Sequence, residues 1–232
     1  MGMGVADTIM AGRVSAADLA GIALGGNFFW PTLMLLTGII MSLTPSVSQL
    51  HGAGREHEAG AVVRQALWIV LTGGGLLIVF LLNVEPLYEM IGVDPLAIPI
   101  AVSYLEAVSY GVLPLLGYFA LRYLCDGMSW TTPAMLIAVS ALVLKIPLNY
   151  LFIYGAFEFE GMGGIGCGWS SAIVMWYELI VMILVVCYSR IRVAGVFERF
   201  SGPDFSAMFK MIKLGLPIGL TIFLEFSMFS VV

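Results

Sequence analysis

The sequence has few charged residues, and this scarcity excludes more than any other feature. Asp, Glu, Lys and Arg make up 11% of the 232 residues, whereas a soluble globular domain carries about 25%. Hydrophobic residues make up 60% of the chain, and the mean hydropathy is +1.01. So few charges cannot cover a surface that faces water, and a soluble protein is therefore excluded.

Histidine and cysteine are also scarce, which removes several kinds of chemistry. The two histidines, His51 and His57, lie among Arg55, Glu56 and Glu58, where we expect them to be solvated. The sequence contains no H-E-x-x-H pattern and no Ser–His pair at one membrane depth. The three cysteines form no C-x-x-C pair, so a disulfide framework is not predicted. We expect no enzyme, no metal site and no cofactor.

Long apolar runs take the place of the missing charges. They lie near residues 18–50, 65–84, 96–121, 133–155, 164–188 and 208–232. Each run can cross a hydrocarbon core of about 30 Å as a helix, and none shows the short alternation of barrel strands. Trp30–Pro31 is expected to kink the first run, because proline lacks a backbone donor. The predicted fold class is an all-α polytopic membrane protein in a lipid bilayer.

Both ends of the chain are predicted to lie inside helices. Residues 1–12 are apolar except for Asp7 and Thr8, but at about 1.5 Å per residue they reach only about 18 Å. The last run continues to Val232 with no exit loop. We expect one partial helix, five full helices and most of a seventh, and we see no cleavable signal peptide.

The basic residues predict the orientation. Eight of the ten Lys and Arg residues follow alternate helices: Arg55, Arg64, Arg122, Arg190, Arg192, Arg199, Lys210 and Lys213. The other connections hold Arg13 and six acidic residues: Asp18, Glu85, Glu89, Asp94, Glu158 and Glu160. Cytoplasmic loops are enriched in Lys and Arg, so the loops near 55, 122 and 200 are predicted to be cytoplasmic in a cell inner membrane. A nucleic-acid partner, which needs a clustered basic surface, is not expected.

Three polar residues share one predicted depth in the outer half of the membrane. Lys145 and Asn149 are four residues apart and so share a helix face. They lie about 15 Å and 9 Å from the outer end of their helix, and Asp7 lies about 8 Å from the same end. We expect these residues to form a buried proton or cation site. Alternatively, Asp7 lies at the interface and Lys145 extends its ammonium toward the headgroups.

Three more carboxylates lie within the predicted spans. Glu225 is about 18 Å beyond Lys213, near the membrane centre, and no basic residue is within one turn. An unpaired carboxylate at that depth is expected to face a water-filled cavity and to attract a cation. Glu106 and Glu178 are weaker candidates, and Glu178 is expected to pair with polar groups of the bundle.

Several motifs, in order along the chain, resemble those of one transporter family. They are MGVADTIMAG at 3–12, QLHGAGR at 49–55, VRQALW at 63–68, CDGMS at 125–129, IPLNYLFIYG at 146–155, GGIGCG at 163–168, LGLPI at 214–218 and FLEF at 223–226. Together they resemble the N-terminal half of NorM-like exporters of the multidrug and toxic compound extrusion (MATE) family. No single motif would identify the family.

The resemblance implies twelve helices in two six-helix lobes that are related by pseudo-two-fold symmetry. Residues 1–190 would then form the first lobe with a truncated first helix, 191–207 the linker, and 208–232 the start of helix 7. It also implies export of cationic or amphipathic drugs in exchange for H⁺ or Na⁺. The family's first-helix carboxylate maps to Asp7, its fifth-helix amide to Asn149, and its seventh-helix carboxylate to Glu225.

Two departures from the family pattern matter. The family commonly has Asn where this chain has Lys145, and an ammonium beside Asp7 takes the place of a sodium ion, so we expect proton coupling. The second lobe is missing, so we expect that residues 1–232 alone do not perform alternating access.

Two other functions stay open from the sequence. A lipid-linked sugar flippase of the same superfamily would favour a cationic cavity, whereas the cavity candidates here are mostly acidic. A non-transporting membrane subunit would tolerate Asp7→Asn and Glu225→Gln.

Overall fold

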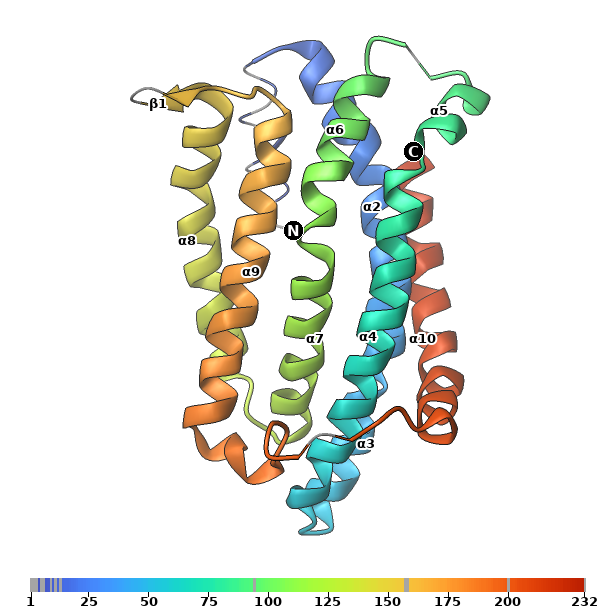
Figure 1. Cartoon of the computed structure of the whole chain (residues 1–232), viewed down its shortest axis with the longest axis vertical. Coiled ribbons are helices and arrows are strands. Elements are labelled where there is room, and N and C mark those ends of the chain that lie inside the picture. The colour runs from blue at the N-terminus through green and yellow to red at the C-terminus, as the bar shows by residue number, and fades with distance from the viewer. Residues whose placement is uncertain are drawn as a thin grey trace.

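The computed structural model is a bundle of roughly parallel helices (Figure 1). It describes residues 4, 7, 8, 10, 12, 14–93, 95–156, 159–199 and 201–231. Its helices are α2 (Ala16–Met41), α3 (Leu43–Gly52), η1 (Glu56–Glu58), α4 (Ala59–Leu82), α5 (Glu85–Ile91), α6 (Ile98–Ser109), α7 (Val112–Gly127), α8 (Thr132–Tyr154), α9 (Ile165–Tyr188), η2 (Arg190–Ala194) and α10 (Phe205–Val231). Among the described residues, five helical segments can each cross a membrane, and the bent pair α6 and α7 makes a sixth. The chain is a multi-pass membrane protein.

The first long span continues through its proline. Pro31 lies inside α2, which runs on to Met41, and only Ser42 separates it from the start of α3 at Leu43. Asn27, whose carbonyl Pro31 cannot bond, lies one turn earlier in the same helix. Together α2 and α3 form one span, Ala17–Gly52.

The span predicted at residues 96–121 is not one straight helix, which corrects the sequence-based expectation. It consists of α6 and α7, bent by 48° at Tyr110 and Gly111, and α7 extends to Gly127. Pro114 cannot donate to the carbonyl of Tyr110, and the indole Nε1 of Trp176 in α9 donates to that carbonyl instead at 3.2 Å. The bend therefore has a local cause, because a side chain of a neighbouring helix bonds the carbonyl that proline leaves free.

The last helix, α10, packs along α2 through a close approach of two glycines. A Cβ atom added to Gly38 of α2 would lie 2.3 Å from the Cα atom of Gly219 in α10. Helices in membranes come this close only where side chains are missing. The segment before α10 is bonded to α4: Arg64 Nη1 donates to the carbonyl of Gly195 at 2.8 Å, and Trp68 Nε1 donates to that of Ser201 at 3.1 Å.

The connections from α4 to α6 and from α8 to α9, at the end of the bundle away from the start of α10, are short (Figure 1). One is α5, and another is a hairpin in which β1 (Gly155–Ala156) pairs antiparallel with β2 (Phe159–Glu160). Apart from these two-residue strands, the regular elements among the described residues are all helices. The predicted all-α fold class is confirmed in this form.

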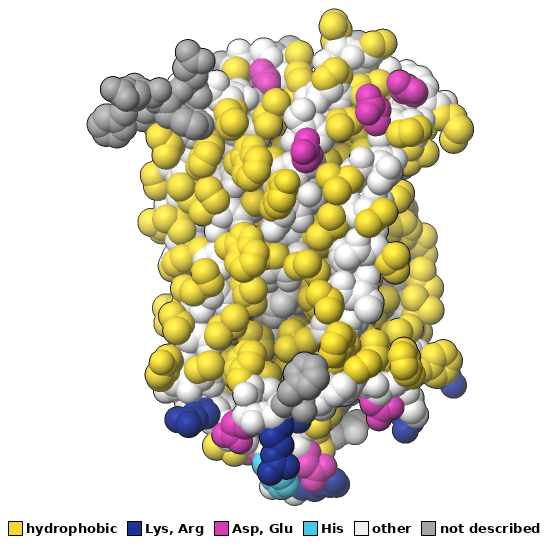
Figure 2. All heavy atoms as spheres, in the orientation of Figure 1, with side chains coloured by type: hydrophobic (Ala, Val, Ile, Leu, Met, Phe, Trp, Pro, Cys, Tyr) yellow, Lys and Arg dark blue, Asp and Glu magenta, His cyan; other side chains and the backbone are white. Residues whose placement is uncertain are grey.

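The surface of the bundle separates apolar and charged side chains. On the face in Figure 2, hydrophobic side chains cover the middle, and the Lys and Arg side chains gather at one end. Exposed large hydrophobic side chains lie along the long helices, for example Leu76 in α4, Val143 in α8 and Leu184 in α9. Such a band is the surface that a lipid bilayer solvates.

Candidate functional site

Three elements far apart in the sequence supply the polar site. Asp7 comes from the N-terminal segment, where a hydrogen bond from Gly12 N to Thr8 O of 3.0 Å shows a helical turn. Lys145 and Asn149 come from α8, on the face that points into the bundle. The hydroxyl of Tyr154 donates to the carbonyl of Met10 at 2.9 Å and holds the segment against α8.

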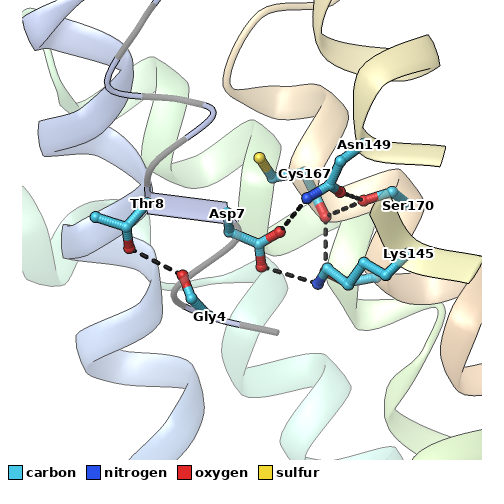
Figure 3. A network of polar contacts seen from close by, with 8 residues as sticks. Gly4, Asp7, Thr8, Lys145, Asn149, Cys167 and Ser170 are labelled. Carbon is cyan, nitrogen blue, oxygen red and sulfur yellow. Dashed lines mark hydrogen bonds and ion pairs between the residues drawn. The ribbon is translucent and has the colours of Figure 1, made fainter. Parts of the chain in front are cut away.

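The side chain of Asp7 is bonded at both of its oxygens (Figure 3). The ammonium of Lys145 donates to Oδ2 at 2.8 Å, and the amide of Asn149 donates to Oδ1 at 2.7 Å. The predicted neighbours therefore meet, and each contacts a different oxygen of one carboxylate. The alternative in which Lys145 extends to the headgroups is wrong, because its side chain is 3% exposed.

Two serines of α9 complete the site, and the sequence analysis missed both. Lys145 Nζ donates to Ser171 Oγ at 2.7 Å, and Ser170 Oγ bonds Asn149 Oδ1. The signal was the adjacent pair Ser170–Ser171 in an otherwise apolar run. We refer to Asp7, Lys145, Asn149, Ser170 and Ser171 as the Asp7 cluster.

The Asp7 cluster is buried, and Lys145 and Ser171 line a cavity beside it. Asp7 is 6% exposed and Asn149 0%, and both serines are buried. Inside a low-dielectric site the carboxylate depends on the ammonium and the amide for its charge to be tolerated. Protonation of Asp7 would remove its charge, weaken both bonds and leave Lys145 without its counter-ion. The contacts that join the N-terminal segment to α8 therefore depend on the charge of Asp7.

The other predicted carboxylates lie apart from the cluster. Glu225 is exposed on α10, and its role as a cation-attracting residue in a cavity stays a prediction. Glu106 is exposed on α6. Glu178 is 6% exposed on α9 and lines a cavity of about 230 Å³ that also reaches Lys145 and Ser171. Among the described residues Glu178 has no hydrogen-bond or ion-pair partner, so the expected pairing is not seen.

The fold and the site define a class of protein: a multi-pass helical membrane protein with an ionisable cluster buried inside its bundle. Comparison with known proteins then places the chain in a family. The MatE family model matches residues 1–151, and the chain belongs to this family. The resemblance drawn from the motifs is thereby confirmed, and the chain is not an enzyme.

The sequence is about 40% identical to those of multidrug resistance proteins from two bacteria. The chain is 41% identical over 231 residues to "Probable multidrug resistance protein NorM" of Xanthomonas campestris pv. campestris, covering 99% of this chain and 50% of that protein. It is 39% identical over 232 residues to "Multidrug resistance protein MdtK" of Yersinia pestis, covering 99% of this chain and 51% of that protein. The chain thus spans about half the length of the curated relatives it matches.

Solved structures share the fold at lower identity. An inward-facing MATE family transporter of the MOP superfamily superposes with a TM-score of 0.86 at 20% identity, covering 97% of this chain and 51% of that one. The eukaryotic MATE transporter AtDTX14 superposes with a TM-score of 0.87 at 18% identity, covering 97% and 49%. The arrangement of helices is therefore that of one half of a MATE transporter.

Proposed function

We propose that the chain forms the N-terminal lobe of a secondary active antiporter that exports cationic and amphipathic drugs in exchange for protons. The observation that supports this most is the buried Asp7 cluster, in a member of a family whose named relatives are multidrug resistance proteins. Because the relatives are about twice as long, we propose that a second lobe completes the transporter. Residues 1–190, 191–207 and 208–232 would be the first lobe, the linker and the start of the second lobe.

Protons are favoured over sodium as the coupling ion because of Lys145. Sodium needs several oxygen ligands, whereas here the ammonium already contacts Asp7 Oδ2 and Ser171 Oγ at 2.8 and 2.7 Å. A cation in this place would have to displace Lys145 or lie beside its charge. A proton needs only an oxygen of Asp7.

The proposed cycle uses the charge of Asp7 as its switch. A proton from the outer side neutralises Asp7 and releases Lys145 and Asn149, which shifts the lobe toward a second packing. Drug leaves outward in that state, and the proton leaves inward after the return. Glu225 would add negative potential to the central cavity between the lobes.

The orientation in this proposal places the basic end in the cytoplasm, with the loops near residues 55, 122 and 200 inside and the chain in a bacterial inner membrane. The gathering of Lys and Arg at one end of the bundle supports it (Figure 2). Arg122 itself lies within α7, five residues before the helix ends, so the cytoplasmic loop that follows it begins at Met128.

Transport in everted membrane vesicles tests the proposal. The chain is co-expressed with the second half of the NorM relative, and accumulation of ethidium, a fluorescent cation, is followed under a proton gradient. We expect accumulation that a protonophore abolishes and Asp7→Asn prevents. Glu106→Gln, an exposed carboxylate outside the cluster, serves as the control.

Two results would contradict the proposal. Accumulation that needs sodium and ignores the proton gradient would make the coupling ion wrong. Activity that survives Asp7→Asn would remove the cluster from the mechanism.

A further inference from the structure

Glu178 is a buried carboxylate that the proposed cycle does not yet use. It lies in α9, it is 6% exposed, and no other described residue bonds it. An ionised carboxylate is expensive inside a membrane protein unless it is paired or reaches water. A chain that keeps such a group without a partner needs either a proton on it or water beside it.

The cavity that Glu178 lines supplies a place for that water. Its volume is about 230 Å³, which is room for several water molecules. Side chains of α2, α6, α7, α8 and α9 form its wall. Its polar lining consists of Tyr104, Tyr118, Arg122, Lys145, Ser171 and Glu178.

The same cavity connects Glu178 to the Asp7 cluster. Lys145 and Ser171 belong to both, and Lys145 Nζ bonds Asp7 directly at 2.8 Å. Ser171 and Glu178 are seven residues apart on α9, which places them on one face and about 10 Å apart along the axis. A row of about two or three waters, joined by hydrogen bonds of about 2.8 Å, spans such a distance.

On its other side the cavity leads toward the end of α7. Arg122 lines the cavity, and its Nε lies 3.6 Å from Asp126 Oδ2. Asp126 is next to Gly127, where α7 ends. Arg122 Nε makes no hydrogen bond to another described residue. The titratable and charged groups that share the cavity with Glu178 are therefore Lys145 of α8, Arg122 and Tyr118 of α7, and Tyr104 of α6, and Asp126 lies behind Arg122.

We propose that Glu178 is the next proton carrier after Asp7, on the way to the basic end of the bundle. The O–H bond on Asp7 breaks as its proton passes to Lys145, which bonds Asp7 and lines the cavity. Lys145 in turn gives one of its own protons to the cavity waters, and an O–H bond forms on Glu178. Asp7 regains its charge and its bonds to Lys145 and Asn149, while Glu178 becomes neutral. The proton then passes from Glu178 toward Asp126. This inference rests on the proposed function, because it assumes that Asp7 takes up and releases protons.

Infrared difference spectroscopy on the whole chain in lipid nanodiscs tests the transfer. Spectra recorded after a rapid rise in pH follow the protonated carboxyl band of Asp7, which is assigned with Asp7→Asn. We expect Glu178→Gln to remove a second band and to slow the loss of the Asp7 band at least about tenfold. Glu178→Asp, which keeps a carboxylate, is expected to restore most of the rate.

The control is Glu106→Gln on α6, an exposed carboxylate that is expected to change neither band nor rate. Size-exclusion profiles establish that each variant is folded, and Glu178→Asp serves if Glu178→Gln is not. An unchanged Asp7 rate in Glu178→Gln overturns the transfer through Glu178 and leaves the antiport proposal intact. If Asp7→Asn removes no band, the proposed function itself fails, and the two failures are thereby distinguished.

Discussion

Two ion pairs of similar length lie in opposite environments. Lys145 Nζ and Asp7 Oδ2 are 2.8 Å apart, with side chains 3% and 9% exposed. Arg55 Nη2 and Glu58 Oε2 are 2.6 Å apart, with side chains 58% and 40% exposed. By distance alone the second pair would be the stronger.

Their consequences differ because water can replace a lost partner only at the surface. An exposed pair exchanges one set of solvated contacts for another, and its net effect is small. Removing one member of a buried pair leaves the other as an uncompensated charge. Burial, more than distance, decides which of the two pairs the fold depends on.

Lys145→Met gives the largest expected effect. It leaves Asp7 with Asn149 as its only described hydrogen-bond donor, and we expect the free energy of unfolding to fall by about 3–5 kcal/mol. Reversible unfolding in mixed micelles measures this, with Lys213→Met on the exposed face of α10 as the control. A loss below about 1 kcal/mol would contradict the central role of burial.

Asn149→Ala is expected to have the second largest effect. Both Asp7 Oδ1 and Ser170 Oγ lose a buried partner, at an expected loss of about 1–3 kcal/mol. The same unfolding measurement applies. Asn83→Ala, which removes an exposed amide bonded to Val79, is the matched control and should change little. Equal losses in the two variants would show that burial of the amide is irrelevant.

The double variant Asp7→Leu with Lys145→Met sharpens the comparison. It removes both charges together, so no buried charge is left alone, and we expect most of the stability lost in Lys145→Met to return. Proton-driven accumulation of ethidium should stay absent, since the switch is gone. If the loss of stability in the double variant equalled the sum of the losses in Asp7→Leu and Lys145→Met, the two side chains would not be energetically coupled.

Arg55→Ala is expected to have the smallest effect. Its guanidinium bonds Glu58 through two nitrogens, at 2.6 and 2.7 Å, but both side chains remain in contact with solvent. We expect no measurable change of the unfolding midpoint. A shift comparable with that of Asn149→Ala would mean that the geometry of the pair outweighs its exposure.

The membrane depth of each residue, obtained by counting along its helix, was enough to predict part of the site. Counting residues from the helix ends placed Asp7, Lys145 and Asn149 together, because rise per residue is nearly constant in a helix. The count of residues did not show which face of each helix turns toward the interior of the bundle. Glu106 and Glu178 both lie within predicted spans, yet one is exposed and the other buried, because neighbouring helices decide which face each helix turns inward.

The bends at the prolines could not be predicted from the sequence either. Pro31 and Pro114 both interrupt backbone bonding, yet α2 continues while α6 and α7 are separated by 48°. The difference comes from the partner: Trp176 of α9 bonds the carbonyl that Pro114 leaves free. Such a partner, 66 residues away, is set by the packing of helices and has no signature near the proline.

The composition of the Asp7 cluster also constrains how the protein is made. Its carboxylate emerges from the ribosome 138 residues before the lysine that will bond it. At about 5–20 residues per second, the two are separated by roughly 7 to 28 s of synthesis. Throughout that interval the N-terminal segment has neither Lys145 nor Asn149 beside it, so Asp7 must stay protonated or near water in the insertion machinery. The N-terminal segment therefore reaches its final place only after α8 has entered the membrane.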